Sequence, residues 1–154
     1  MNHDLPCFPQ GLYWQELPQG FKVRTHRRTV TEADLVAFIS ASGLLEVIFI
    51  DADHGGAMGG RPVPAALTQC FIEGMQMQGL IQATGLALLE INTKVLAPVR
   101  IGDSVWATIL VSHVHPTSKG NRAVITFDAA VFNQRDEQVM SYTVKRLIAG
   151  KPDA

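Results

Sequence analysis

The chain has 154 residues, and its composition excludes several classes of protein before any motif is considered. Apolar residues make up 47% and charged residues 18%, which is typical of a folded globular protein and excludes a disordered one. The formal net charge of −1 argues against nucleic acid and against an anionic membrane surface as partners. We expect one domain over residues 11–150, between short tails at residues 1–10 and 151–154.

The cysteine content indicates the compartment. Cys7 and Cys70 are too few for a disulfide framework, and we expect both to be reduced thiols in a cytoplasmic protein. The first ten residues are polar and contain two prolines, which is not typical of a signal peptide or a targeting helix.

The first elements in chain order are a lead-in, a strand and a short helix. Residues 11–20 form the lead-in, and Phe21 to Val30 is a plausible strand with Phe21, Val23 and Thr25 on one side. Thr31 is a typical N-cap, and Asp34 makes a variant of the capping box with it. Ser42-Gly43 ends this helix, because glycine is favoured just beyond a helix C-terminus.

An apolar run and a glycine-rich loop follow. Leu44 to Ile50 contains one charge, Glu46, and Asp51 to Gly60 reads DADHGGAMGG. The loop lacks the lysine and hydroxyl of a P-loop, and no strand–glycine–helix pattern supports a dinucleotide fingerprint. We therefore interpret it as a mobile surface loop, a kind that often covers a site.

The rest of the chain is organised around a helix within Arg61 to Gln82, which is entered through two prolines. Its polar residues form only a narrow stripe, and a helix apolar around most of its circumference is usually buried. It is too short and too polar to cross a bilayer. Gly74 lies in mid-helix at a cost of about 1 kcal/mol relative to alanine, so we expect close packing there.

Four strand patterns follow the helix and are separated by short turns. Short turns favour antiparallel pairing, and one face of the resulting sheet is apolar. The simplest arrangement is a curved antiparallel sheet wrapped around one long helix, an α+β fold. The predicted strands are Ala87–Val99, Ser104–His115, Ala123–Phe132 and Val139–Ile148.

Several segments together resemble the MaoC-like dehydratase family, over Leu12 to Ile148. They read RTVTEADLVAFISASG, GRPVPAALTQCFIEGMQMQGL, VLAPVRIGDSV and FNQRDEQVMSYTVKRLI. The resemblance implies the hot-dog fold and an R-specific enoyl-CoA hydratase activity. It also implies homodimers or higher oligomers whose sheets join, with acyl tunnels near the interface. The coenzyme A thioester is then part of the substrate, and no cofactor is expected.

The chain departs from the family at the catalytic dyad. The hydratases carry a D-x-N-P-x-H-x-D pattern after the serine-glycine pair, and its first Asp and its His move the protons. Those two positions are Leu44 and Phe49 here, and only the trailing acid, Asp51, is retained. Leu and Phe cannot transfer protons, and such assistance is commonly worth ~10²–10⁴-fold in rate.

The family's oxyanion element is a backbone N–H at the start of the central helix. The corresponding pair here is Ala65-Ala66, which makes the Ala66 N–H the candidate donor. A backbone donor survives a change of side chain, and a helix N-terminus favours a developing oxyanion.

Glu46 is the leading candidate for acid–base chemistry, because a carboxylate within an apolar run can be tuned to act near neutral pH. Its alternative role is an ordinary residue paired with an arginine or facing solvent. Asp51, at the family's retained acidic position, is the second catalytic candidate, although for Asp51, Asp53 and His54 we favour structural or solvated roles.

Other polar residues give weaker signals. His113 and His115 share one strand face, but no third ligand completes a metal site, and none is expected. Six basic residues are candidates for coenzyme A phosphates or for ordinary solvated positions. They are Arg27, Arg28, Lys119, Arg122, Lys145 and Arg146.

Three functions therefore stay open. The first is a hydratase or dehydratase of acyl-CoA with a noncanonical acid–base residue. The second is a noncatalytic acyl-CoA-binding or structural subunit, in which Leu44 and Phe49 fill the former site. The third is a hot-dog thioesterase, which again points to Glu46.

Overall fold

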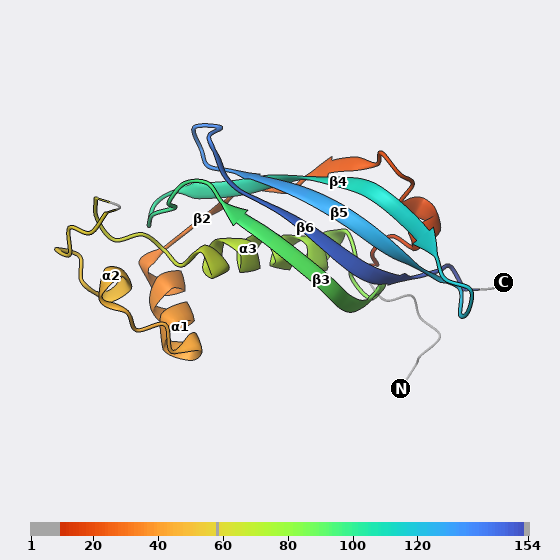
Figure 1. Ribbon diagram of the computed structural model, residues 1–154, viewed down its shortest axis with the longest axis horizontal. Coiled ribbons are helices and arrows are strands. Elements are labelled where there is room, and N and C mark those ends of the chain that lie inside the picture. Colours follow the sequence, from red (N-terminus) through yellow and green to blue (C-terminus); the bar gives the residue numbers. More distant parts are fainter. Residues whose placement is uncertain (1–9, 58, 153–154) are drawn as a thin grey trace.

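The computed structural model describes residues 10–57 and 59–152, so most of the expected N-terminal tail, with Cys7, and the last two residues lie outside the described part. A long helix, α3 (Ala65–Gly79), lies under a six-stranded antiparallel sheet with the order β1-β4-β5-β6-β3 (Figure 1). The predicted α+β arrangement is confirmed. The strands are β1 (Lys22–Arg24), β2 (Arg28–Thr29), β3 (Gly85–Val95), β4 (Ser104–Pro116), β5 (Arg122–Phe132) and β6 (Gln138–Ala149); β2 also pairs with β4. The other helices are η1 (Trp14–Glu16), α1 (Glu32–Ser42) and α2 (Val47–Ile50).

The three long strands β4, β5 and β6 supply most of the core. Every second residue of each strand is buried along most of its length, as the alternating pattern predicts. On β5 the buried residues are Ala123, Ile125, Phe127, Ala129 and Val131, which the sequence places on one face.

The predicted strand over Phe21 to Val30 is divided in two. Thr25 makes the break, because its hydroxyl accepts a hydrogen bond from the Ala107 N–H at 2.9 Å. His26 and Arg27 then leave the ladder before β2 begins. Phe21, Val23 and Thr25 are half-buried on one side of the chain, as expected.

Helix α1 begins and ends as its sequence predicts. The Thr31 hydroxyl accepts the Asp34 N–H at 3.2 Å, and the Asp34 carboxylate accepts the Thr31 N–H at 2.9 Å. Gly43 follows in the left-handed conformation with φ 74°. The two buried residues of the helix are Leu35 and Ile39.

Helix α3 is shorter and less enclosed than the sequence indicates. Ala66, Cys70 and Met77 are exposed on one face in the single chain. A Cβ added at Gly74 would meet no atom within 4 Å, so the expected close packing there is wrong for the single chain. Among the described residues, no helix is long and apolar enough to span a membrane.

Strand β3 forms an edge of the sheet, and this position leaves its apolar side chains exposed. All eleven of its residues are exposed in the single chain, so the apolar face that we expect of the sheet is not covered along this strand. The strand also ends at Val95 rather than Val99, because the N–H groups of Leu96 and Ala97 both turn to the Val139 carbonyl. An apolar edge strand of this length is a template for pairing with another chain.

Candidate functional site

The N-terminus of α3 provides a backbone donor that has no acceptor among residues 10–57 and 59–152. Pro64 is its N-cap, and the Pro64 carbonyl accepts the N–H of Leu67 at 2.9 Å. Within the described part of the chain, no backbone or side-chain acceptor takes the N–H of Ala66, and Ala66 is exposed. The first N–H groups of a helix lack partners within the helix and carry its positive dipole end, so this group can bind an anionic oxygen.

A small apolar cavity lies beside this donor. It has a volume of about 30 Å³ and is lined by Ala65 and Thr68 of α3, by Val95 of β3, and by Val139 and Met140 of β6. This volume is far below that of an ordinary ligand pocket, which is about 300–1,000 Å³. The single chain alone therefore provides no room for a long acyl group at this point.

The segment that carries the remaining candidates lies near the beginning of α3. Figure 1 shows α1 and α2 at that end of the molecule, below and beyond the sheet. Glu46 is exposed there, and its carboxylate accepts the Ile48 N–H at 3.2 Å as the N-cap of α2. The apolar enclosure that the sequence indicates for Glu46 is thus not present in the single chain.

The other candidates of this segment have different surroundings. Phe49 is half-buried and packs against the core, whereas Leu44 is 40% exposed. Asp51 is exposed, and its carboxylate accepts the Asp53 N–H at 2.9 Å, which closes a turn after α2. The segment therefore presents apolar surface to the outside, and its exposed apolar residues are Leu44, Leu45, Val47 and Ile50.

A buried polar network between α3 and β6 has no counterpart in the sequence predictions. The Glu73 carboxylate accepts from the Tyr142 hydroxyl at 2.8 Å and from the Gln76 amide at 3.0 Å, and it is ion-paired with Arg146. Burial raises the pKa of Tyr142 and lowers that of Arg146. One pattern in the sequence could have indicated this network. Tyr142 and Arg146 lie two residues before and after Val144 on the last strand, so all three side chains point to the buried face of the sheet.

One of the six basic residues that were candidates for binding coenzyme A phosphates belongs to this buried network instead. Arg146 is 3% exposed, so it does not reach a coenzyme A phosphate at the surface. Arg28 pairs with Asp34 at 2.8 Å, and Lys145 pairs with Glu90 at 2.6 Å. The remaining basic candidates, Arg27, Lys119 and Arg122, are exposed.

The two histidines of β4 are exposed, as their position near a turn indicates. His113 and His115 line one shallow groove on the sheet together with Lys145. Over residues 10–57 and 59–152, no group of three or more His, Cys, Asp and Glu side chains is arranged to hold a metal ion.

Comparison with known structures supports the fold. The MaoC-like dehydratase from Rhodospirillum rubrum is 21% identical, with 93% of this chain and 100% of that chain covered and a TM-score of 0.81. The R-hydratase PhaJ1 from Pseudomonas aeruginosa is 22% identical, with 92% and 88% covered and a TM-score of 0.76. A Mycobacterium tuberculosis protein with a double hot-dog fold is 15% identical, with 94% and 46% covered and a TM-score of 0.84.

The sequence comparisons define the family. No curated protein matches the chain. Residues 19–142 match the family described as FAS1-like, dehydratase domain region. The match covers most of the chain and shows that the chain belongs to this dehydratase family, and its hot-dog architecture confirms the resemblance to the MaoC-like dehydratases.

Proposed function

We propose that this chain is a hydro-lyase that adds water to, or removes it from, an acyl-coenzyme A thioester. The observation that carries the proposal is the free Ala66 N–H at the N-terminus of the fifteen-residue helix α3, in a chain of the dehydratase family. In the proposal the thioester is part of the substrate, and no further cofactor takes part. A cytoplasmic location belongs to the same proposal.

The Ala66 N–H stabilises the charge that develops during the reaction. Water adds to C3 of a trans-2-enoyl thioester, and the π electrons of the double bond move toward the carbonyl to form an enolate. The enolate oxygen accepts the Ala66 N–H and lies at the positive end of α3. Loss of one such donor typically costs about 10²–10³ in kcat.

Glu46 is the proposed acid–base residue, because it is the single carboxylate of the segment Leu44–Ile50. It accepts the proton of the attacking water and returns a proton to C2 when the enolate collapses. Glu46 is exposed in the single chain, so this role requires that bound substrate or a second copy of the chain covers it.

A homodimer is part of the proposal. Strand β3 and the residue after it expose six large apolar side chains by 42–58%. Pairing of two copies along β3 would cover them, together with the exposed face of α3. It would also bring a second chain to the small cavity beside Ala66. The six residues are Leu86, Leu88, Leu89, Ile91, Val95 and Leu96.

The test follows the absorbance of trans-2-enoyl-CoAs of several chain lengths and, in parallel, the release of free thiol. We expect loss of enoyl absorbance without thiol release. Ala66→Pro should then lose about 10²-fold in kcat, since proline removes the N–H and is tolerated in the first helical turn. Glu46→Gln should lose about 10²-fold or more, whereas Glu137→Gln, an exposed control on the β5–β6 turn, should not.

Each other outcome selects a different function. Thiol release would indicate a thioesterase. Saturable acyl-CoA binding without turnover would indicate the noncatalytic alternative. Full activity of Glu46→Gln would reject the role of Glu46 and keep the hydro-lyase.

A further inference from the structure

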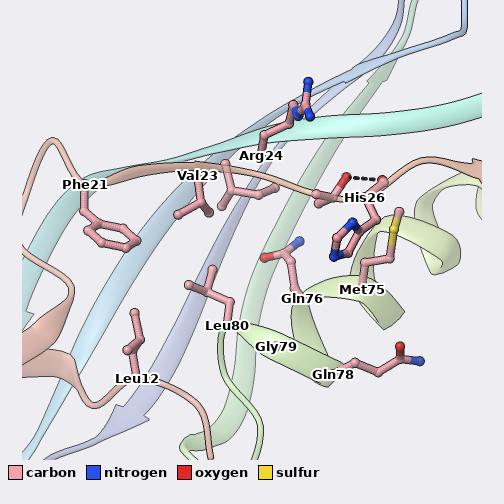
Figure 2. Close-up of a pocket in the computed structure, with 12 residues that line it drawn as sticks. Leu12, Phe21, Val23, Arg24, His26, Met75, Gln76, Gln78, Gly79 and Leu80 are labelled. Atoms are coloured by element: carbon pink, nitrogen blue, oxygen red, sulfur yellow. Dashed lines mark hydrogen bonds between the residues drawn. The ribbon is translucent and has the colours of Figure 1, made fainter. Parts of the chain in front are cut away.

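A second and much larger cavity lies beside the C-terminal half of α3. Its volume is about 530 Å³, which is within the range of small-molecule sites. Its walls come from the lead-in, from β1 and the residues flanking it, from β4 and from α3, as Figure 2 shows. The apolar part of the wall consists of Leu12, Phe21, Val23, Met75, Leu80 and Ile109.

One buried polar group of this cavity has an unused acceptor. Gln76 is 2% exposed, and its Nε2 donates to the Tyr142 hydroxyl at 2.7 Å and to the Glu73 carboxylate at 3.0 Å. The carboxylate can only accept, so the amide nitrogen must face it, and the amide orientation is fixed. The Gln76 Oε1 is then left without a donor among the described residues.

Figure 2 shows the Gln76 side chain rising from α3 between Leu80 and His26, toward the strand side of the cavity. The nearby Thr25 hydroxyl cannot satisfy it, because that hydroxyl donates to the His26 carbonyl at 2.9 Å. A buried acceptor without a donor is unfavourable. The Oε1 itself has almost no accessible surface in the free protein, so the side chains around it must shift for a ligand to bring a donor to it and remove this cost.

The surrounding charges define the rest of the ligand. An anionic head group would be repelled by the lone pairs of the Gln76 amide oxygen. It would also be repelled by the Glu73 carboxylate, which accepts a hydrogen bond from the same amide group. A cationic head group would find no acidic residue among those that line the cavity. Arg24 and His26 belong to the lining, but the Arg24 guanidinium lies over the Trp106 ring and points away from Gln76 (Figure 2), so it does not offer an anion a partner beside the amide. The cavity therefore suits a neutral molecule with an aliphatic body and an O–H or N–H donor.

We propose that this cavity binds a neutral aliphatic alcohol or amide, whose donor hydrogen-bonds to the Gln76 Oε1. The site is separate from the proposed oxyanion donor, since Gln76 follows Ala66 by ten residues, or about 15 Å of helix. It also lies on a different face of α3 from the exposed Ala66, Cys70 and Met77. The inference therefore stands whether or not the hydro-lyase activity is found.

The test titrates the full-length protein with two isomers, 1-hexanol and 1-methoxypentane, and follows amide chemical shifts by NMR. Both fit the cavity, but only the alcohol can donate. We expect shifts at Val23, Leu80 and Ile109 with none at Ala66, and about tenfold tighter binding of 1-hexanol than of its isomer. Hexanoate, which has no donor when ionised, should bind at least about tenfold more weakly than 1-hexanol.

Two variants locate the site. Gly79→Leu fills the cavity without a clash, since a Cβ there meets no atom within 4 Å, and it should abolish binding of both isomers. Gly55→Leu introduces the same side chain in an equally open position outside the cavity and should leave binding unchanged. Gln76→Met removes the acceptor, and it should reduce the preference for the alcohol to less than about threefold.

Three results would overturn the proposal. Equal affinity for the two isomers would reject the donor requirement. Binding that persists in Gly79→Leu would reject the location. An absence of shifts at the solubility limit of 1-hexanol would reject the proposal that this cavity binds such a molecule.

Discussion

The ion pair of Glu73 with Arg146 joins α3 to β6, and its burial determines how much its loss should cost. The Arg146 side chain is 4% exposed and that of Glu73 is 19% exposed. Glu73→Gln keeps the shape and the acceptor but leaves the guanidinium without a counter-charge. Removing one partner of a buried pair costs about 3–5 kcal/mol, and we expect the lower end because glutamine still accepts hydrogen bonds. For a chain of this length, this corresponds to a decrease in Tm of about 6–12 °C.

The neighbouring residue of β6 supplies a matched control. Lys145 pairs with Glu90, and these side chains are 43% and 56% exposed. Glu90→Gln makes the same chemical change at the surface, where an ion pair is worth about 0–1 kcal/mol. Denaturant unfolding followed by circular dichroism, at one protein concentration for all variants, measures both free energies of unfolding.

A loss in Glu73→Gln no larger than that in Glu90→Gln would refute the reasoning, because it would mean that water reaches the Arg146 guanidinium. The double variant Glu73→Met with Arg146→Met provides a second check. It should be more stable than Glu73→Gln, since no charge is then left buried without its partner.

Three further predictions concern other parts of the fold. Thr31→Ala should cost about 1 kcal/mol. The Thr31 hydroxyl lowers the pKa of Asp34, so the free energy of unfolding should fall as pH falls below about 4. Urea unfolding at several pH values should show that the free energy of unfolding depends less on pH in the variant. Burial raises the pKa of Tyr142, so stability should be lost as pH rises above about 10, and Tyr142→Phe should lack this component while costing about 1–3 kcal/mol at neutral pH. Val95→Lys should shift the protein from dimer toward monomer in light scattering, and an unchanged dimer would exclude pairing along β3.

Local features of the chain were sufficient to predict the architecture. Period-two alternation predicted β4, β5 and β6 within two residues at each end, and Thr31 with Asp34 predicted the start of α1. These signals depend on neighbours in sequence, which is why they could be interpreted without the fold. The start of α3 belongs to the same class, since it follows from the prolines before it. The choice of Ala66 as an oxyanion donor came from the family resemblance and stays a prediction.

Only the tertiary structure decided which polar residues are buried and which apolar residues are not. Glu73 and Arg146 are 73 residues apart, and no periodicity indicates that one neutralises the other. The apolar residues of β3 are exposed because the strand is at an edge, and Glu46 faces solvent although its sequence neighbours are apolar. The cavity at Gln76 likewise exists only where the lead-in, β1 and α3 meet. Burial and charge pairing depend on contacts between distant segments, so the sequence determined the framework and the packing determined the chemistry of its sites.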